Sequence, residues 1–586
     1  MKMKLFSLFL SVILLTASLT GATYAQVEDV PASETVQISS REVPCYLASL
    51  ENYYDLPLYF INDVEDLPYI DLKDLADLMV SVMGEPDYGL WLETDGYMAQ
   101  FTRETNYSML FDFQDGTISF DDFDAFVHSA DDTSLLDIVA TDARDDKDNP
   151  LLLEKINKGS FDRYGKEITL SLTDYDIHLY WSEEEDIYLV PLQTMGDFLV
   201  SARWHYNVLF NGEGVYVATA ELLGSPNTEL TPLGKSYYSA EKKDMSKELA
   251  WFNYCELCLV LDHLYGLKEI HDITSFDRVF EETGYKTPLS STDPNIADGA
   301  LNDFIYYYLD DLHSGFQSAS FRTEEMVTSG GYGLSGLRDS ETGDIFNKAR
   351  AAADHQIQTY EEVGNTAYIT FDQFRLHNGP VTDYYDGSVD VPTDPADASL
   401  DTIALIIYAH EQICREDSPI ENVVLDLSLN GGGTLDAGVY ITSWFLGDAA
   451  LSIRSSLTGA ISTGTYRADT NLDGLFDEWD TLSDKHLFCL IGPYSFSCGN
   501  LVPAMLKDSH KVTILGKTSG GGSCSVLPLS TANGAMFRIS SPYRMSNLKN
   551  GSYYDTDTGI DPDCIIVKPE NFYDREALTD YINNLF

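Results

Sequence analysis

The stretch HLFCLIGPYSFSCGNLVPAMLKDSHKVTILG (486–516) decides the fold of the C-terminal half of this chain. Its apolar start predicts a buried strand, which breaks sharply before Ser497, and an apolar helix pattern begins directly after that serine. A hydroxyl at the start of a helix lies beside unpaired backbone N–H groups and the positive end of the helix dipole. Because such groups stabilise an oxyanion, Ser497 is a candidate nucleophile. The alternative is an N-cap serine with no chemical role.

A second apolar strand lies upstream, in ENVVLDLSLNGGGTLDAGVYITSWFLGD (421–448), and it ends in Asn430 and the glycines 431–433. Three glycines let the backbone approach a ligand closely and turn its N–H groups inward. A glycine-rich turn after one strand and a serine after another are the two halves of an acyl-transfer site, namely the oxyanion donors and the nucleophile.

These segments resemble the tail-specific, or C-terminal-processing, serine protease family. VVLDLSLNGGG (423–433) is similar to that family's strand of Asp, Leu, Arg, any residue, Asn, any residue, Gly, Gly, and SFSCGNLVPAMLKD (495–508) is similar to its nucleophile helix. The resemblance covers roughly residues 240–586. It implies an α/β catalytic domain of the crotonase-like kind, with Ser497 as nucleophile and the oxyanion held by the N–H of Cys498 and a glycine near Gly432.

The general base departs from the common bacterial pattern. Most bacterial members place a lysine about twenty-five residues after the serine, and here that position is Gly522, while Lys517 comes five residues too early. NDFIYYYLDDLHSGFQ (302–317) instead resembles the Asp-x-His-Ser/Thr segment of the lysine-free branch, which is related to the tricorn-like proteases. The resemblance implies His313 as base, and an imidazole suits that work at neutral pH. The alternative is a histidine that only caps a helix C-terminus.

Two supporting roles are less defined by the sequence. The tricorn-like enzymes carry a glutamate just before a Gly-x-x-Pro-Asp segment, and YYDTDTGIDPDCIIV (553–567) has that segment without a glutamate. Asp557 or Asp555 is a candidate substitute, and either is also consistent with a solvated loop carboxylate. The relay serine precedes the histidine in those enzymes, whereas here the candidate is Ser314, which follows it.

Composition limits the partners. The chain has 586 residues, enough for three or four domains, and 36 basic against 94 acidic residues give a net charge of −58. Such a charge argues against nucleic acid or an anionic membrane surface as a partner. The expected partner is a protein or peptide substrate.

The N-terminus predicts export. Lys2 and Lys4 precede an apolar stretch (5–19) and small residues, with cleavage expected after Ala25 or Ala22, which is the pattern of a secretory signal peptide (1–25). No later stretch is long and apolar enough to span a bilayer. We therefore expect a secreted, extracellular protein without a membrane span.

The segments between the signal peptide and the catalytic domain predict a duplicated α+β module. LPYIDLKDLADLMVSVMG (67–84) and IYLVPLQTMGDFLVSARW (187–204) each give a strand and a short amphipathic helix, which places modules at 26–140 and 141–235. The second resembles the small domain that precedes the catalytic part of copper amine oxidases, without a copper site. A helical segment (236–325), with helices expected at 240–266 and 297–311, then leads to the catalytic domain (326–586).

A calcium loop is predicted in DTNLDGLFDEWD (469–480). Its oxygen donors occupy the spacing of a calcium loop, with a sharp turn at Gly474, and the predicted ligands are Asp469, Asn471, Asp473, Leu475 through its carbonyl, Asp477 and Asp480. The ion would be structural, and catalysis is expected to require no cofactor.

These patterns together predict a secreted serine endopeptidase with a Ser-His based site that hydrolyses peptide bonds of proteins or peptides. The alternative is a protease-fold protein that has lost catalysis and acts as an extracellular binding module. That alternative follows from the missing lysine and the undefined acid.

Overall fold

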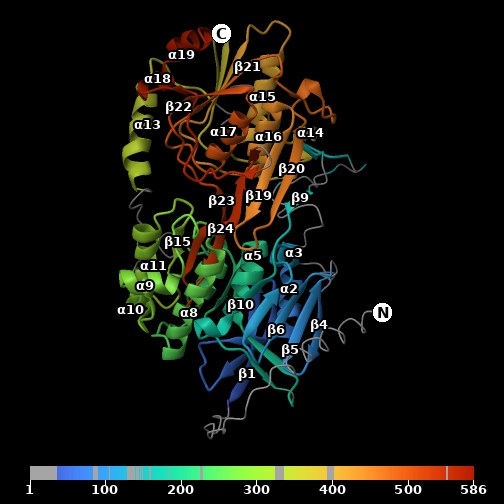
Figure 1. The fold of residues 1–586 in the computed structure, drawn as a ribbon, viewed down its shortest axis with the longest axis vertical. Helices are drawn as coiled ribbons and strands as arrows, with labels where there is room; N and C mark the ends of the chain where they lie inside the picture. Colours follow the sequence, from blue (N-terminus) through green and yellow to red (C-terminus); the bar gives the residue numbers. More distant parts are fainter. Residues whose placement is uncertain are drawn as a thin grey trace, which may run out of the picture.

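The computed structural model describes residues 36–83, 90–103, 106–128, 139, 144, 147, 149–156, 160–182, 184–224, 229–323, 336–391, 401–549 and 552–585. The predicted signal peptide lies outside the described residues. The fold is mixed α/β, in agreement with the predicted class, and the chain forms two lobes along its long axis (Figure 1). In the part of the chain that the structure describes, no helix combines the length and apolar character needed to cross a membrane.

The N-terminal lobe contains two antiparallel-rich sheets. The first has the order β11-β12-β3-β2-β1-β14-β13, formed by β1 (Ile38–Leu47), β2 (Tyr53–Ile61), β3 (Tyr69–Asp71), β11 (Tyr180–Ser182), β12 (Ile187–Pro191), β13 (Asn207–Phe210) and β14 (Val215–Ala218). The second has the order β10-β7-β6-β5-β4, formed by β4 (Leu90–Asp95), β5 (Met98–Arg103), β6 (Ser108–Asp112), β7 (Thr117–Phe120) and β10 (Ile168–Ser171).

Both sheets take strands from each side of residue 140, so the predicted modules 26–140 and 141–235 are interleaved rather than separate. The duplicated pattern is present, because β3 runs directly into α2 (Leu72–Met83) and β12 into α4 (Leu192–Met195), η2 (Gly196–Ser201) and α5 (Ala202–Trp204). The two copies pair with each other, with Leu189 opposite Asp71 and Pro191 opposite Tyr69. Strands this short leave backbone groups unpaired when alone, and pairing the copies satisfies them.

The helical segment follows as expected. Its long helix α8 (Lys247–Leu264) begins at Ser246, whose hydroxyl accepts the Leu249 N–H at 3.0 Å. The second predicted helix corresponds to α11 (Pro294–Asp303) and η3 (Phe304–Leu309). The other helices are short: α7 (Pro232–Tyr237), which begins before the predicted start of the segment at 236, α9 (Phe276–Thr283) and α10 (Lys286–Leu289).

The C-terminal lobe is organised by a six-stranded sheet of order β16-β17-β18-β21-β22-β27. Its strands are β16 (Tyr360–Val363), β17 (Thr366–Thr370), β18 (Asn422–Asp426), β21 (His486–Ile491), β22 (Val512–Gly516) and β27 (Cys564–Ile565). From β17 onward the neighbours are parallel. The crossover helices are α15 (Thr402–Cys414), α16 (Leu435–Leu446) and α17 (Cys498–Asp508). Since β18 and β21 are adjacent and parallel, the segments that follow them meet at one edge.

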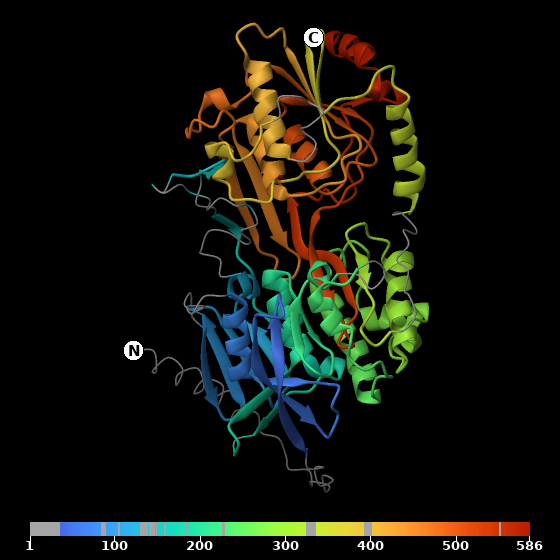
Figure 2. The ribbon, with the colours of Figure 1, turned by 180° about the vertical axis from the view of Figure 1, so that it is seen from behind.

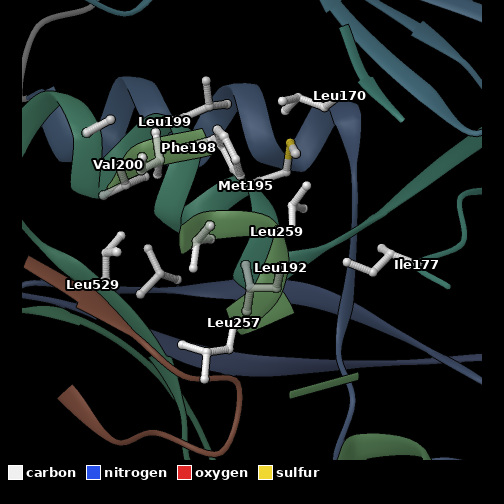
Figure 3. Close-up of a cluster of buried hydrophobic side chains, with 14 of the residues drawn as sticks. Leu170, Ile177, Leu192, Met195, Phe198, Leu199, Val200, Leu257, Leu259 and Leu529 are labelled. Atoms are coloured by element: carbon white, nitrogen blue, oxygen red, sulfur yellow. The ribbon is translucent and has the colours of Figure 1, made fainter. Parts of the chain in front are cut away.

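A further sheet joins the two lobes. Its path is β15-β24-β19-β20-β8, with β23 on β24 and β9 on β20, formed by β8 (Leu153–Lys155), β9 (Ser160–Arg163), β15 (Gly315–Ser318), β19 (Ala449–Ser455), β20 (Ile461–Ala468), β23 (Cys524–Ser530) and β24 (Met536–Ser546). In Figures 1 and 2 the β23–β24 hairpin reaches from the upper lobe into the lower one. Its side chains enter the N-terminal core, where Leu529 packs with residues of α4, η2 and α8 (Figure 3).

The other described elements are short connections or terminal helices: α3 (Phe123–His128), η1 (Leu172–Tyr175), α6 (Ala220–Leu223), η4 (Leu337–Gly343), α13 (Asp344–Ala351), α14 (Asp383–Asp386), η6 (Glu478–Asp480), β25 (Leu548–Lys549), β26 (Ser552–Tyr553), α18 (Glu570–Tyr573) and α19 (Arg575–Asn583).

Candidate active site

Ser497 lies at the turn between β21 and α17, as predicted. Its backbone has φ 55° and ψ −123°, a conformation that non-glycine residues rarely adopt and that costs about 1–3 kcal/mol. The N–H of Ser497 donates to the carbonyl of Gly521 at 2.9 Å, which holds the turn in place. Although the residue stands at the N-cap position, its hydroxyl makes no capping hydrogen bond. The strained turn therefore holds a hydroxyl that the helix itself does not use.

Asn430 joins the glycine-rich turn to the serine turn. This fully buried residue accepts the Phe496 N–H on its carbonyl at 3.0 Å and donates its amide to the carbonyl of Phe371, also at 3.0 Å. As a result Gly432 lies against Ser497: a Cβ at Gly432 would stand 2.7 Å from Ser497 Cβ and 3.1 Å from its Oγ. The structure brings together the two halves of the predicted site.

The oxyanion donors differ in one detail from the prediction. The N–H of Gly432 donates to Asn430 Oδ1 at 2.9 Å, so it is already engaged. Among the described residues, no acceptor is found for the N–H of Gly433 or for that of Cys498, the first residue of α17. The Cys498 thiol is buried and donates to the Gly433 carbonyl at 3.2 Å, and burial raises its pKa to about 12. This thiol is therefore protonated near neutral pH and is a poor nucleophile.

His313 lies beside the serine turn rather than at a helix end. Helix η3 ends with Asp310 as its C-cap, three residues before the histidine. The His313 ring packs against Phe496, with 4.6 Å between the ring centroids, and its buried Nδ1 has no hydrogen-bond partner among the described residues. Burial lowers the pKa of His313 below 6.5, opposed by the negative charges of Asp311 and then Asp557. No hydrogen bond joins this ring to Ser497 in the described parts of the chain.

Asp557 lies on the loop that closes over the serine turn. Its Oδ1 accepts the Ser523 N–H at 2.9 Å and the Ser523 hydroxyl at 3.1 Å, and its carbonyl accepts the Gly522 N–H at 3.1 Å. The alternative acid, Asp555, is paired with Arg544 and accepts the Asp557 N–H at 2.8 Å. Of the two, Asp557 is the one whose charge acts on His313.

Asp311 is a supporting carboxylate that the sequence reasoning did not single out. It is buried, its Oδ1 accepts the backbone N–H of His313 at 3.0 Å, and its Oδ2 accepts the Ser314 hydroxyl at 2.6 Å. Ser314 also accepts the Ser540 N–H at 3.4 Å, and no hydrogen bond from it to His313 is found in the described structure. The Asp-x-His spacing was the available signal, because an aspartate two residues before a histidine can accept its backbone N–H.

The predicted calcium loop is closed by its own hydrogen bonds. Asp469 Oδ2 accepts the Gly474 N–H at 2.8 Å and the Tyr385 hydroxyl at 3.0 Å, while Asp480 Oδ1 accepts the Thr470 N–H at 2.7 Å. Over the described residues, no group of three or more His, Cys, Asp or Glu side chains is placed to hold a metal. The four aspartates among the six predicted ligands thus do not form such a group, and Asp469 Oδ1 is buried with no hydrogen-bond partner among the described residues.

A cavity of about 410 Å³ opens beside the glycine-rich turn. It is lined by Arg338, Asn347, Asp372, Gln373, Leu429, Gly431, Gly432, Gly433 and Tyr494. Gly432 lines this cavity and also lies against Ser497, so the cavity is next to the serine turn.

Residues 399–566 match the sequence model of peptidase family S41. The carboxy-terminal-processing protease of Bartonella bacilliformis is 31% identical over 158 residues, which cover 26% of this chain and 32% of that relative, so the match spans about a third of its length. Among solved structures, a peptidase of Parabacteroides merdae is 16% identical over 58% of this chain and 97% of its own, with a TM-score of 0.39. Mature CPAF complexed with lactacystin is 12% identical over 58% and 97% of the two chains, with a TM-score of 0.36. Residues 399–566 of this chain are therefore similar in sequence to peptidase family S41, and part of the chain is similar to a carboxy-terminal-processing protease.

Proposed function

We propose that this chain is a secreted serine endopeptidase that hydrolyses peptide bonds of proteins or peptides, with a catalytic domain of the crotonase-like kind. The observation that carries the proposal is the contact between Gly432 and Ser497 at the shared edge of β18 and β21. It puts backbone N–H groups, a strained serine and a cavity for substrate within one small region. The match of residues 399–566 to peptidase family S41 supports the same reaction class.

In the proposed mechanism, His313 removes the proton from the Ser497 hydroxyl as its oxygen attacks the substrate carbonyl. The N–H of Cys498 and an N–H of the glycine-rich turn hold the oxyanion, and Gly433 supplies the N–H of that turn that is not engaged. The imidazolium then protonates the leaving amine as the C–N bond breaks, which leaves the acyl group as an ester on Ser497. Water attacks this ester while His313 takes its proton, and His313 returns a proton to the serine oxygen as the acid product leaves. Catalytic hydrogen bonds often tighten only in the substrate complex, so we expect the His313–Ser497 bond to form on binding.

Two carboxylates support the imidazolium in this scheme. Asp311 fixes the backbone of His313, and Asp557 acts on the ring by its charge. Lys517 has no role in this scheme. Its ammonium lies 5.8 Å from the ring of Phe346, and Phe346 packs in a different hydrophobic cluster from the side chains of α17, the helix that follows Ser497.

The test is cleavage of unfolded casein by the mature chain (26–586), compared with Ser497→Ala, His313→Ala and, as a control, Ser552→Ala, which removes an exposed hydroxyl. We expect cleavage by the wild type and the control and a loss of at least about a thousandfold in the other two. A fluorophosphonate probe should label the wild type and not Ser497→Ala. Absence of both cleavage and labelling in the wild type would favour the extracellular binding module instead.

Export is a separate part of the proposal. It rests on the predicted signal peptide, and N-terminal sequencing of the protein recovered from the medium tests it. We expect the mature chain to start at Gln26 or Thr23, which follow the two expected cleavage positions. Retention of the full N-terminus inside the cell would contradict it.

A further inference from the structure

Arg544, near the end of strand β24, is a buried cation connected to the candidate acid by two side chains. It is 2% exposed, and its Nη2 is paired with Asp555 Oδ2. Its Nε donates to the Ser523 hydroxyl at 3.3 Å. Asp555 and Ser523 are also the residues whose side chains contact Asp557, so one guanidinium anchors both supports of the candidate acid.

Asp557 is held at its backbone and at one carboxylate oxygen. Its N–H donates to Asp555 Oδ1 at 2.8 Å, and its Oδ1 accepts the Ser523 N–H at 2.9 Å and the Ser523 hydroxyl at 3.1 Å. The Ser523 hydroxyl thus accepts from Arg544 and donates to Asp557, and charged groups at the two ends strengthen both bonds. Within the described residues Asp557 Oδ2 makes no hydrogen bond, which leaves this oxygen for the His313 ring.

Strand β24 also positions the candidate base. Gly315, which follows His313 closely in the chain, pairs with Arg538 of this strand, and Arg544 lies further along it. The strand therefore supports the base through β15 and the acid through the partners of Arg544. A single element sets how the two groups lie relative to each other, which favours a fixed catalytic geometry.

The charges around His313 make the position of Asp557 important. Burial is the largest influence on the His313 pKa and lowers it; the charges of Asp311 and then Asp557 oppose this effect, and those of Arg538 and Arg338 add to it. Asp557 is half-buried on a loop, and a carboxylate in such a place has several accessible rotamers unless hydrogen bonds select one.

We propose, building on the peptidase function proposed above, that Arg544 and Ser523 are positioning residues that hold the Asp557 carboxylate toward His313 and act on the reaction only through it. A carboxylate fixed in advance stabilises the imidazolium as it forms, without reorganisation at that moment. Neither residue lines the cavity beside the glycine-rich turn, so their effect is expected on kcat rather than on KM.

The first experiment measures kcat and KM against pH for the wild type, Ser523→Ala and Ser525→Ala, on a peptide taken from a casein cleavage site. Ser525 is a matched control on the same strand, because its hydroxyl is bonded to that of Ser541, at 2.5 Å, and not to Asp557. Ser523→Ala should lower kcat about fivefold to tenfold, leave KM within about twofold and move the acidic midpoint down. Ser525→Ala should follow the wild type, and unchanged kcat and midpoint in Ser523→Ala would overturn the inference.

Arg544 is tested by Arg544→Lys, which keeps the charge and loses the fork of donors that reaches two partners at once. We expect the same changes as in Ser523→Ala, and wild-type kinetics in a folded variant would overturn the role of Arg544. If circular dichroism shows that this variant does not fold, Asp555→Asn takes its place. The Asp555 side chain is 40% exposed, and the change removes the charge that pairs with Arg544, so wild-type kinetics would again contradict that role.

A double-mutant cycle separates positioning from a general structural effect. On an Asp557→Ala background, Ser523→Ala should change kcat by less than about twofold, because the group through which it acts is missing. An equal loss on both backgrounds would show that Ser523 acts in another way and would overturn the inference.

The last measurement needs no catalysis. In Ser497→Ala with ¹³C-labelled histidine, NMR follows the titration of His313, whose signal is assigned by its loss in His313→Gln. Adding Ser523→Ala should lower the His313 midpoint by at least about 0.5 pH unit, and adding Ser525→Ala should not. An unchanged midpoint would refute the positioning role. Failure of the wild type to cleave casein would instead overturn the peptidase function, because the titration still reports whether Ser523 acts on His313.

Discussion

Two carboxyl groups, Asp197 of η2 and Glu256 of α8, are buried at the contact of the N-terminal lobe with helix α8 and strand β23. Glu256 Oε2 accepts the Thr194 hydroxyl at 2.7 Å, and within the described structure Glu256 Oε1 has no hydrogen-bond partner. Asp197 accepts the Gln193 amide at 2.9 Å, and the same amide donates to Ser530 of β23 at 2.9 Å. The contact between the β23–β24 hairpin and the N-terminal lobe thus contains two carboxyl groups. None of these hydrogen bonds comes from a Lys or Arg side chain.

The expected effect follows from their protonation. Burial raises the pKa of Glu256 to about 8, with a further rise from the charge of Asp197, and burial raises the pKa of Asp197 to about 7. Each carboxyl has a higher pKa in the folded protein than in the unfolded chain. Its contribution to the free energy of unfolding is therefore fully present below the pKa of the unfolded chain and is lost as pH rises through the pKa of the folded protein. The loss is about 1.4 kcal/mol per pH unit for each group, or roughly 4 kcal/mol for Glu256 between about pH 5 and pH 8.

The perturbation is Glu256→Gln, which keeps the shape and an acceptor for Thr194 and removes the titration. We expect its unfolding free energy to lie within about 1 kcal/mol of wild type near pH 5 and to exceed it by several kcal/mol near pH 8. Urea unfolding of the mature chain at several pH values, followed by circular dichroism, measures the difference. Glu248→Gln, an exposed position on the same helix, is the control and should follow the wild type. A constant difference between Glu256→Gln and wild type from pH 5 to pH 8 would refute the reasoning.

Three further outcomes are expected. Gly432→Ala should lower kcat/KM at least about a hundredfold and leave the circular dichroism spectrum unchanged. The reason is that the added Cβ would stand 2.7 Å from Ser497 Cβ, and the φ of 106° disfavours a side chain. Near-normal kinetics would contradict the site geometry. Since burial lowers the pKa of His313 below 6.5, the acidic limb of kcat/KM should have its midpoint below that value, and a midpoint above it would exclude His313 as the free base. The spacing of the loop around Asp469 predicts calcium binding, so about 1 mM CaCl₂ should raise the Tm of the wild type by a few degrees and leave the Tm of Asp473→Asn unchanged. Equal Tm values of the wild type with and without calcium would count against calcium binding.

The parts of the fold that follow from local pattern were predictable. The apolar run before Ser497 and the helix after it correspond to β21 and α17, and 421–448 gives β18 and α16. The interleaving of strands from both sides of residue 140 was not predictable, because a short strand has two possible partners of similar pattern. The pairing of β3 with β12 is chosen by the core that both copies share.

The candidate site also has a part that the sequence predicts and a part that it does not. Ser497 and Gly432 follow strands that are neighbours in a parallel sheet, so their approach follows from the order of the elements. The nearness of His313 to this turn depends instead on β15, which pairs with β24 far along the chain. The roles of Asp311, Asp557 and Asp555 could not be separated by sequence, because a carboxylate's role depends on which groups surround it in space.

By itself, the sequence determined the strand-turn-helix units around residues 421–448 and 486–516, the resemblance to the tail-specific proteases and the helical segment before them. These are set by hydrophobic periodicity and by glycines, which act over a few neighbouring residues. Only the tertiary structure decided that the two N-terminal copies share one sheet, that Asn430 accepts the Gly432 N–H, and that Arg338 packs on the Tyr494 ring. Those features depend on contacts between residues distant in the chain, which are selected by the packing of whole elements and leave no local pattern to read.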